Sequence, residues 1–160
     1  MSLDHEAPYV ALCERLQLFC GPYLKWPVRR RDPSFDSIAP ENQPAMFVLA
    51  THQTPTVARN QMPAVWTLGA MVVIYATATD DPESSAEPDI NTIVSKIDAA
   101  LLRQSTETPT LLPGPTLQMW TTLGGTVQSA VPGAVVMVGG QDAKQGIAVM
   151  QIEMTCFPSA

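Results

Sequence analysis

The stretch AVWTLGAMVVIYATA, residues 64–78, constrains the fold of this chain more than any other segment. Both of its alternating sets of residues are apolar: Val65, Met71, Val73 and Tyr75 on one side, and Trp66, Leu68, Val72 and Ile74 on the other. A strand of this kind must be covered on both faces. A buried helix is the competing interpretation, but the β-branched and aromatic residues favour a strand. We therefore expect a long strand at about 64–78 inside a sheet.

Further strands are expected at about 28–31, 44–51, 123–138 and 146–157. The segment TPTVARNQMP, which follows the second of these, lacks any period and is either a mobile connection or the arm of a hairpin. The segment VGGQDAKQG, before the last strand, suits a hairpin loop. The last strand should bury one face, because every second residue is apolar: Ala148, Met150, Ile152, Met154 and Cys156.

Two segments show the three- and four-residue spacing of helices. The first covers about 4–20 and ends at Gly21-Pro22, a common helix stop. The second covers about 90–103, with Asp89 placed to cap it. Its apolar stripe consists of Ile90, Ile93, Val94, Ile97 and Leu101. The sequence thus predicts one α+β domain over residues 1–160, a largely antiparallel β-sheet with two α-helices packed on it.

The charge balance argues against a protein that grips nucleic acid through its phosphates. The chain has 15 acidic side chains against 9 lysines and arginines, a formal net charge of −6. Such binding needs clustered cations, and the one basic cluster, Arg29–Arg31, is too short to supply them. No apolar run reaches the ~20 residues of a membrane span, and no secretion signal is visible. The three cysteines, which lack CxxC spacing, fit reduced thiols of a cytosolic protein.

The residues that carry catalysis and metal binding are scarce. His5 and His52 have no nearby acid or thiol in a recognisable motif, so both are interpreted as surface histidines. The acidic loop around 80–89, which contains Asp80, Asp81, Glu83 and Glu87, lacks the register of a calcium loop. We expect no enzyme, no metal and no cofactor.

The glycine pair in TLGGTVQ, residues 122–128, could suggest a phosphate cradle. A P-loop needs a following Lys-Ser/Thr, and a dinucleotide site needs GxGxxG opening a helix; the residues after Gly124-Gly125 continue as strand sequence instead. We expect the pair to let the chain bend on entering a strand, or to let another backbone approach closely. In a ring protein, that backbone would belong to the neighbouring subunit.

Several segments, taken in order, resemble one family. NQPAMFVL (42–49), just after VRRRD (28–32), is similar to the "QPA-apolar-F-V" segment of tailed-phage tail terminator proteins. WTLGAMVVIYATATDDP (66–82) resembles their long strand and acidic loop, and INTIVSKIDAAL (90–101) resembles their helix. TLGGTV (122–127) and QGIAVMQIEMTCFP (145–158) are similar to their LGG strand start and their closing strand. The connection 104–118 and the loop around Pro132-Gly133 depart from the pattern.

The resemblance implies a structural virion protein at the junction of head and tail, assembled in the host cytoplasm. Tail terminators form a ring, typically hexameric, that caps the tail tube, stops its growth and offers a surface to head-completion proteins. DNA passes through the lumen without specific binding. We expect Asp80, Asp81, Glu83 and Glu87 to line or rim this lumen, where negative charge repels DNA.

Two groups of residues are candidates for subunit or tube contacts. They are the arginines Arg29, Arg30, Arg31 and Arg59, which could pair with acidic partners, and the glycines Gly124 and Gly125. A tail-tube or head-completion protein of the same virion is the alternative. A small-ligand-binding domain or an enzyme is a more distant one, because a fold does not exclude a function.

Overall fold

The long apolar segment forms strand β2, Val65–Thr77, which lies inside a four-stranded sheet. The structure is a computed structural model that describes residues 3–30, 38–57, 64–78, 84–107, 119–138 and 145–157. The other strands are β1, Ala45–Thr56, β3, Ser129–Val138, and β4, Gln145–Cys156. Their order across the sheet is β1-β2-β4-β3, and every neighbouring pair is antiparallel. The two edge strands, β1 and β3, therefore run in opposite directions.

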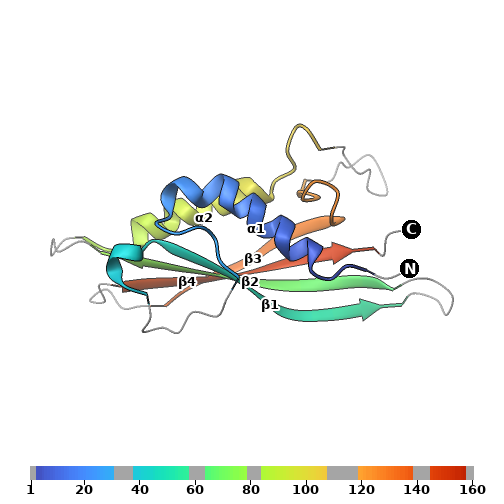
Figure 1. Cartoon of the computed structure of the whole chain (residues 1–160), viewed down its shortest axis with the longest axis horizontal. Helices are drawn as coiled ribbons and strands as arrows, with labels where there is room; N and C mark the ends of the chain where they lie inside the picture. Colours follow the sequence, from blue (N-terminus) through green and yellow to red (C-terminus); the bar gives the residue numbers. More distant parts are fainter. Residues whose placement is uncertain are drawn as a thin grey trace.

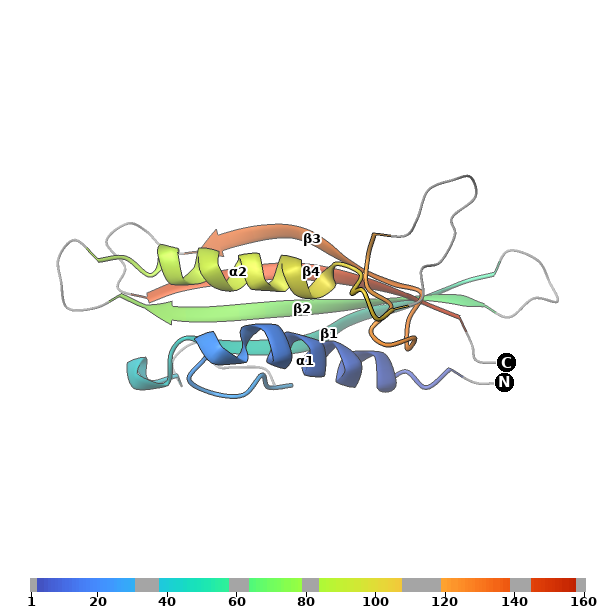
Figure 2. The ribbon, with the colours of Figure 1, turned by 90° about the horizontal axis from the view of Figure 1, so that it is seen from above.

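Two helices cover one face of this sheet, α1, Ala7–Cys20, and α2, Glu87–Leu101 (Figure 1). Seen from above, they lie side by side, α1 over the β1 half of the sheet and α2 over the β4 half (Figure 2). The expected α+β domain, a largely antiparallel sheet with two packed helices, is confirmed. Two short 3₁₀ turns, Gly21–Tyr23 and Pro40–Asn42, complete the elements of the described residues.

The main core lies between the helices and the sheet. Every second residue of β2 from Leu68 to Ala76 is buried there, and so is the apolar set expected for β4. The helices contribute the buried side chains of Tyr9, Leu12, Leu16, Cys20, Ile90, Ile93, Ile97, Ala100 and Leu101. The first turn of α2 comes close to β4, because a Cβ on Gly146 would lie only 3.0 Å from Cβ of Ala86.

The opposite face of the sheet, here called the open face, is covered by neither helix. A second, smaller cluster packs on one half of it, formed by Ile38, Ala45, Phe47, Val73 and Tyr75. Phe47 and Tyr75 meet edge to face, with ring centroids 5.8 Å apart. In this half, β2 is buried on both faces, as its sequence predicts.

Three local expectations need correction. The segment expected as a strand at 28–31 forms only an isolated bridge from Arg29 to Phe47, while Arg31 lies outside the described residues. Helix α2 starts earlier than expected, at Glu87 with Ala86 as its N-cap, so Asp89 lies in the first turn instead of capping. There its carboxylate still favours the helix through the helix dipole.

The third correction concerns the strand expected at 123–138. Strand β3 begins only at Ser129, because Leu123, Gly124 and Gly125 have φ values of 49°, 71° and 91°. Three successive residues in the left-handed region make a turn and cannot continue an extended strand. By contrast, β1 extends to Thr56, so that this part of the aperiodic segment is the arm of a hairpin with β2.

Candidate functional site

The basic cluster is divided between two places in the fold. Arg29 lies against the outer edge of β1: its N–H donates to the carbonyl of Met46 at 3.2 Å, and its carbonyl accepts from the N–H of Val48 at 2.8 Å. Its guanidinium lies 4.4 Å from the ring centroid of Trp26. Arg29 thus occupies the edge of the first half of β1 and closes it to other strands.

Arg30 points towards the start of α1 instead. It forms an ion pair with Glu6, and its guanidinium lies 4.8 Å from the ring centroid of Tyr9. The hydroxyl of Tyr9 in turn donates to the carbonyl of Gly69 at 3.0 Å. Arg30 therefore has partners within its own chain, although an exposed ion pair of this kind contributes little stability. Arg31 and Arg59 lie outside the described residues.

The predicted acidic lumen residues are only partly described. Asp80, Asp81 and Glu83 lie outside the described residues. Glu87 is the first residue of α2, and its side chain is exposed in the first helical turn. Its negative charge lies at the positive end of the helix dipole. This interaction alone accounts for an acidic residue at the start of α2.

Gly124 and Gly125 form an exposed turn in front of β3. The N–H of Gly125 donates to the carbonyl of Thr122 at 3.0 Å. A Cβ on either glycine would have no other atom within 4 Å. The bend expected from TLGGTVQ is therefore present, but among the described residues no other strand or helix comes close to the position of a Cβ on either glycine.

The edges of the sheet carry apolar residues that sequence reasoning did not single out. The end of β3 exposes Val136 by 58%, Met137 by 45% and Val138 by 54%. On the opposite edge, β1 is exposed throughout from Thr51 to Thr56, and Val57, which follows it, is 58% exposed. Among the described residues, no further strand pairs with the outer edge of β3. The sequence feature that could have indicated this apolar edge is the run AVVMV at 134–138, which has no polar residue on either alternating set.

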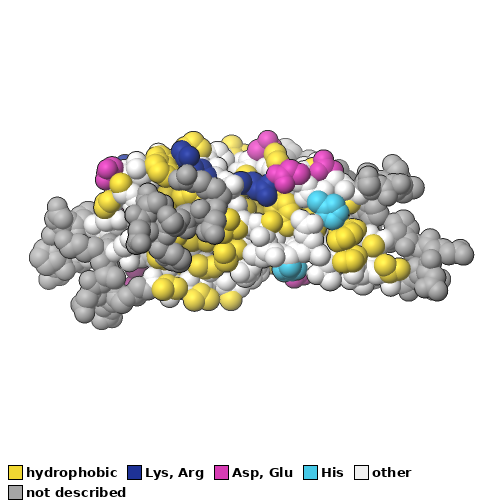
Figure 3. All heavy atoms as spheres, turned by 60° about the horizontal axis from the view of Figure 1, so that its bottom comes forward, with side chains coloured by type: hydrophobic (Ala, Val, Ile, Leu, Met, Phe, Trp, Pro, Cys, Tyr) yellow, Lys and Arg dark blue, Asp and Glu magenta, His cyan; other side chains and the backbone are white. Residues whose placement is uncertain are grey.

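Away from the second cluster, the open face is polar and mostly uncharged. One cross-strand row consists of hydroxyl residues on all four strands, namely Thr54, Thr67, Thr155 and Ser129. Figure 3 shows this side of the molecule obliquely, with hydrophobic (yellow) and white atoms over much of the described surface and most Lys, Arg, Asp and Glu side chains in its upper part.

Next to this row the open face is hollowed between two β-bulges. The bulges lie between Ala50 and Gln53 of β1 and between Pro132 and Val135 of β3. The hollow has a volume of about 640 Å³, and His52 and Glu153 are its titratable residues. Among the described residues that line the hollow, neither has a second titratable side chain beside it on its own strand.

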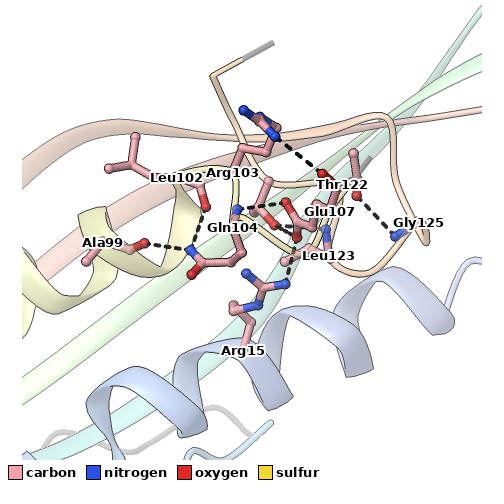
Figure 4. A network of polar contacts seen from close by, with 10 residues as sticks. Arg15, Ala99, Leu102, Arg103, Gln104, Glu107, Thr122, Leu123 and Gly125 are labelled. Atoms are coloured by element: carbon pink, nitrogen blue, oxygen red, sulfur yellow. Dashed lines mark hydrogen bonds and ion pairs between the residues drawn. The ribbon is translucent and has the colours of Figure 1, made fainter. Parts of the chain in front are cut away.

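A polar network fastens the chain after α2 onto α1 (Figure 4). Nη2 of Arg15 donates to Oε1 of Glu107 at 2.7 Å, and Oγ1 of Thr121 donates to the same oxygen at 2.5 Å. The backbone N–H of Gln104 donates to Oε2 at 3.1 Å. The side chains of Arg15 and Glu107 are only 14% and 6% exposed. The pair joins residues 92 positions apart, so no sequence pattern indicated it.

The network decides the charge of Glu107. Burial on its own raises the pKa of this carboxyl, but the hydrogen bonds from Thr121, Arg15 and Gln104 outweigh it and hold the pKa below its usual range. Glu107 is therefore ionised at neutral pH and pairs with Arg15 as a carboxylate.

The thiols are poorly reactive, and the described residues offer no metal centre. Burial raises the pKa of Cys13 and Cys156 to about 11 and that of Cys20 to about 12, so their nucleophilic thiolate forms are rare at neutral pH. Within the described ranges, no three His, Cys, Asp or Glu side chains come together in a way that could hold a metal ion. None of the helices described is long and apolar enough to cross a membrane.

Comparison with known proteins finds likeness among solved structures but not among family models or curated proteins. No protein-family model matches the chain, and no curated protein matches it. It is similar to a solved chain described as "Virion of native gene transfer agent (GTA) particle", with a TM-score of 0.49 and 10% sequence identity over 92% of both chains. At this score and identity the likeness is too weak to assign a function.

Proposed function

We propose that this chain is a structural virion protein of a tailed phage or a phage-like particle, and within that class a tail terminator. The main support is the agreement between the resembling segments and the elements of the fold. NQPAMFVL leads into β1, WTLGAMVVIYAT spans β2, INTIVSKIDAAL lies in α2 and QGIAVMQIEMTC lies in β4. The order of these four resembling segments therefore follows the order of the elements of the α+β fold, whereas TLGGTV lies in the turn before β3.

In the proposed function, copies of the chain join head to tail in a ring, with a hexamer as the expected size. A heterologous contact, in which two different patches meet, generates a ring when the rotation between copies closes. The sheet supplies two such patches, because its edges belong to different strands. The ring caps the last ring of tail-tube subunits, stops tube growth and binds the head-completion protein on its other side.

DNA passes through the central hole in this proposal. The acidic residues Asp80, Asp81, Glu83 and Glu87 are the proposed rim, where like charge keeps DNA from binding. Arg29, Arg31 and Arg59 are proposed contacts to acidic partners. Arg30 is the weaker candidate of the four, since Glu6 already pairs with it.

The first test is the assembly state of the purified protein. We expect native mass spectrometry and negative-stain electron microscopy to show discrete rings of one size. Open-ended tubes would instead favour a tail-tube protein, and a monomer at all concentrations would contradict ring formation.

The second test uses particles assembled without this protein. We expect overlong tails, or tails without heads, in electron micrographs. Tails of normal length joined to heads would refute the terminator role, whereas normal tails without heads would favour a head-completion protein.

A further inference from the structure

We propose that the outer edge of β3 at Val135–Val138 is a subunit contact, and that it pairs with the end of β1, Thr54–Val57, of a second copy. The inference rests on the proposed function, in which copies join in a ring, and it names the contact that joins them. It is carried by the two exposed apolar stretches on opposite edges of the sheet.

The end of β3 lacks the features that keep edge strands apart. Exposed edges of monomeric proteins usually carry charges, prolines or bulges. Val136, Met137 and Val138 are apolar, about half exposed and free of all three. The earlier part of β3 is different, because Pro132 and the bulge after it interrupt the edge. An accessible apolar ladder is thus confined to the last residues of β3.

The edge of β1 is open to a partner only over its second half. Arg29 occupies the edge beside Phe47, and the bulge between Ala50 and Gln53 interrupts the ladder. Beyond the bulge, the strand is exposed and is followed by the apolar side chain of Val57. Pro55 has no N–H, so at that position a partner strand can bond only to its carbonyl.

Strand direction favours a second copy as the occupant. An extended chain can continue the backbone hydrogen bonds of an exposed strand edge. Since β1 and β3 run in opposite directions, a rotation about an axis inclined to the strands brings β1 of the next copy against β3 in antiparallel orientation, displaced along the strands. The order β1-β2-β4-β3 then continues into the next copy without inversion.

The faces of the two strands also match. Val136 and Val138 lie opposite Val149 and Ile147 on the open face, and Thr54 and Thr56 of β1 belong to the same face. Met137 lies opposite Ala148 on the helix side, as Pro55 lies opposite Trp66. A pairing that keeps the faces continuous brings valines beside threonines, and Met137 beside residues of the helix side.

The test is a cysteine pair across the proposed contact. Val136→Cys is combined with Thr54→Cys or with Thr56→Cys, because the two pairings differ by one step of the ladder. The positions are exposed or at the edge. Cys20 and Cys156 are buried, Cys13 is half-buried and all three thiols have raised pKa values, so mild oxidation should act on the new thiols. The control combines Val136→Cys with Thr67→Cys, which lies in the same row as Thr54 but one strand inside the sheet.

We expect at least one of the two edge pairs to give a ladder of covalent oligomers on denaturing gels, and the control pair to give none. A mixture of the two single variants should give covalent dimers only. Disulfide-linked dimers from Val136→Cys alone would mean that β3 pairs with β3, which overturns the proposal. Cross-linking of the control pair would mean that the partner lies on the open face, which also overturns it.

A second variant separates this inference from the proposed function. Val136→Glu should raise the dissociation constant between copies about 10-fold or more, because a charge on an edge strand blocks pairing. Thr92→Glu, on the exposed side of α2, is the matched control and should leave assembly unchanged. Suppose that the wild-type protein forms rings, but the cysteine variants do not cross-link and Val136→Glu does not weaken assembly. The proposed contact is then wrong, while the proposed ring stands. If the wild-type protein forms no ring, the proposed function fails.

Discussion

At the scale of single residues, Glu107 shows how an ion pair can define where a connection runs. Its carboxylate accepts hydrogen bonds from α1, from the turn after α2 and from the segment before β3. A buried pair that loses one partner leaves the other charge without compensation. One end of Arg15, Nη1, is already buried without a hydrogen bond among the described residues. The loss of Glu107 should therefore also leave the buried guanidinium of Arg15 with fewer hydrogen bonds and without its counter-charge.

Glu107→Gln should lower the free energy of unfolding by about 2 kcal/mol at pH 7, less than the ~3–5 kcal/mol of a fully buried pair. Because the folded pKa of Glu107 is lowered, its contribution is present above the usual carboxyl pKa and is lost as pH falls through the folded value. Urea denaturation at pH 7 and near pH 3 measures this difference. We expect the variant and the wild type to converge in acid; a gap that stays constant with pH would contradict the ionised pair. Glu14→Gln, on the exposed side of α1, is the control.

Sequence alone could not reveal this network, and the reason is physical. Arg15 and Glu107 look like ordinary surface residues in their own segments, and no local pattern links residues 92 positions apart. Their pairing depends on the fold, which brings together residues far apart in the chain. The same holds for the hollow beside His52 and Glu153, because bulges on two separate strands create it.

At the scale of elements, the sequence predicted the type of each helix and long strand but not every boundary. Hydrophobic periodicity located α1, α2, β2 and β4 well because burial of one face or of both produces it. Periodicity failed at 123–128, where turn conformations override the apolar pattern. It also missed the length of β1, because the exposed half of an edge strand has no apolar face to show. Among the site residues, the sequence indicated a bend at Gly124-Gly125 but put it within a strand that begins only at Ser129, whereas the exposed edges follow from sheet order alone.

The turn before β3 gives a prediction about its glycines. Gly125→Val should destabilise the fold by about 1–2 kcal/mol, because φ is 91° and a β-branched residue is strained there, although its Cβ would meet no other atom. Gly125→Asn should cost less, since asparagine tolerates the left-handed region better. Thermal unfolding of both variants provides the measurement. Equal losses for the two would show that backbone strain is not the cause, and a loss of assembly without a loss of stability would restore a role at a subunit contact.

At the scale of the whole molecule, the proposed contact is free of charged side chains. Thr54–Val57 and Val135–Val138 contain only apolar and hydroxyl residues. We therefore expect the dissociation constant between copies to change by less than about twofold between ~0.05 and ~0.5 M NaCl, because screening weakens only contacts between charges. Analytical ultracentrifugation over this range is the measurement. A steep weakening with salt would instead favour contacts through Arg29, Arg31 or Arg59.

The two open edge stretches lie at opposite ends of the sheet. Through Val149 and Val73, Val136 is level with Phe47 and not with the end of β1. Copies joined through these stretches cannot lie side by side with their strands level. Each must slide along its neighbour, and the strands lean across the wall, as they do in closed barrels. If the proposed ring forms through this contact, its strands are inclined to the ring axis, and the side chains that face the central hole lie in inclined rows.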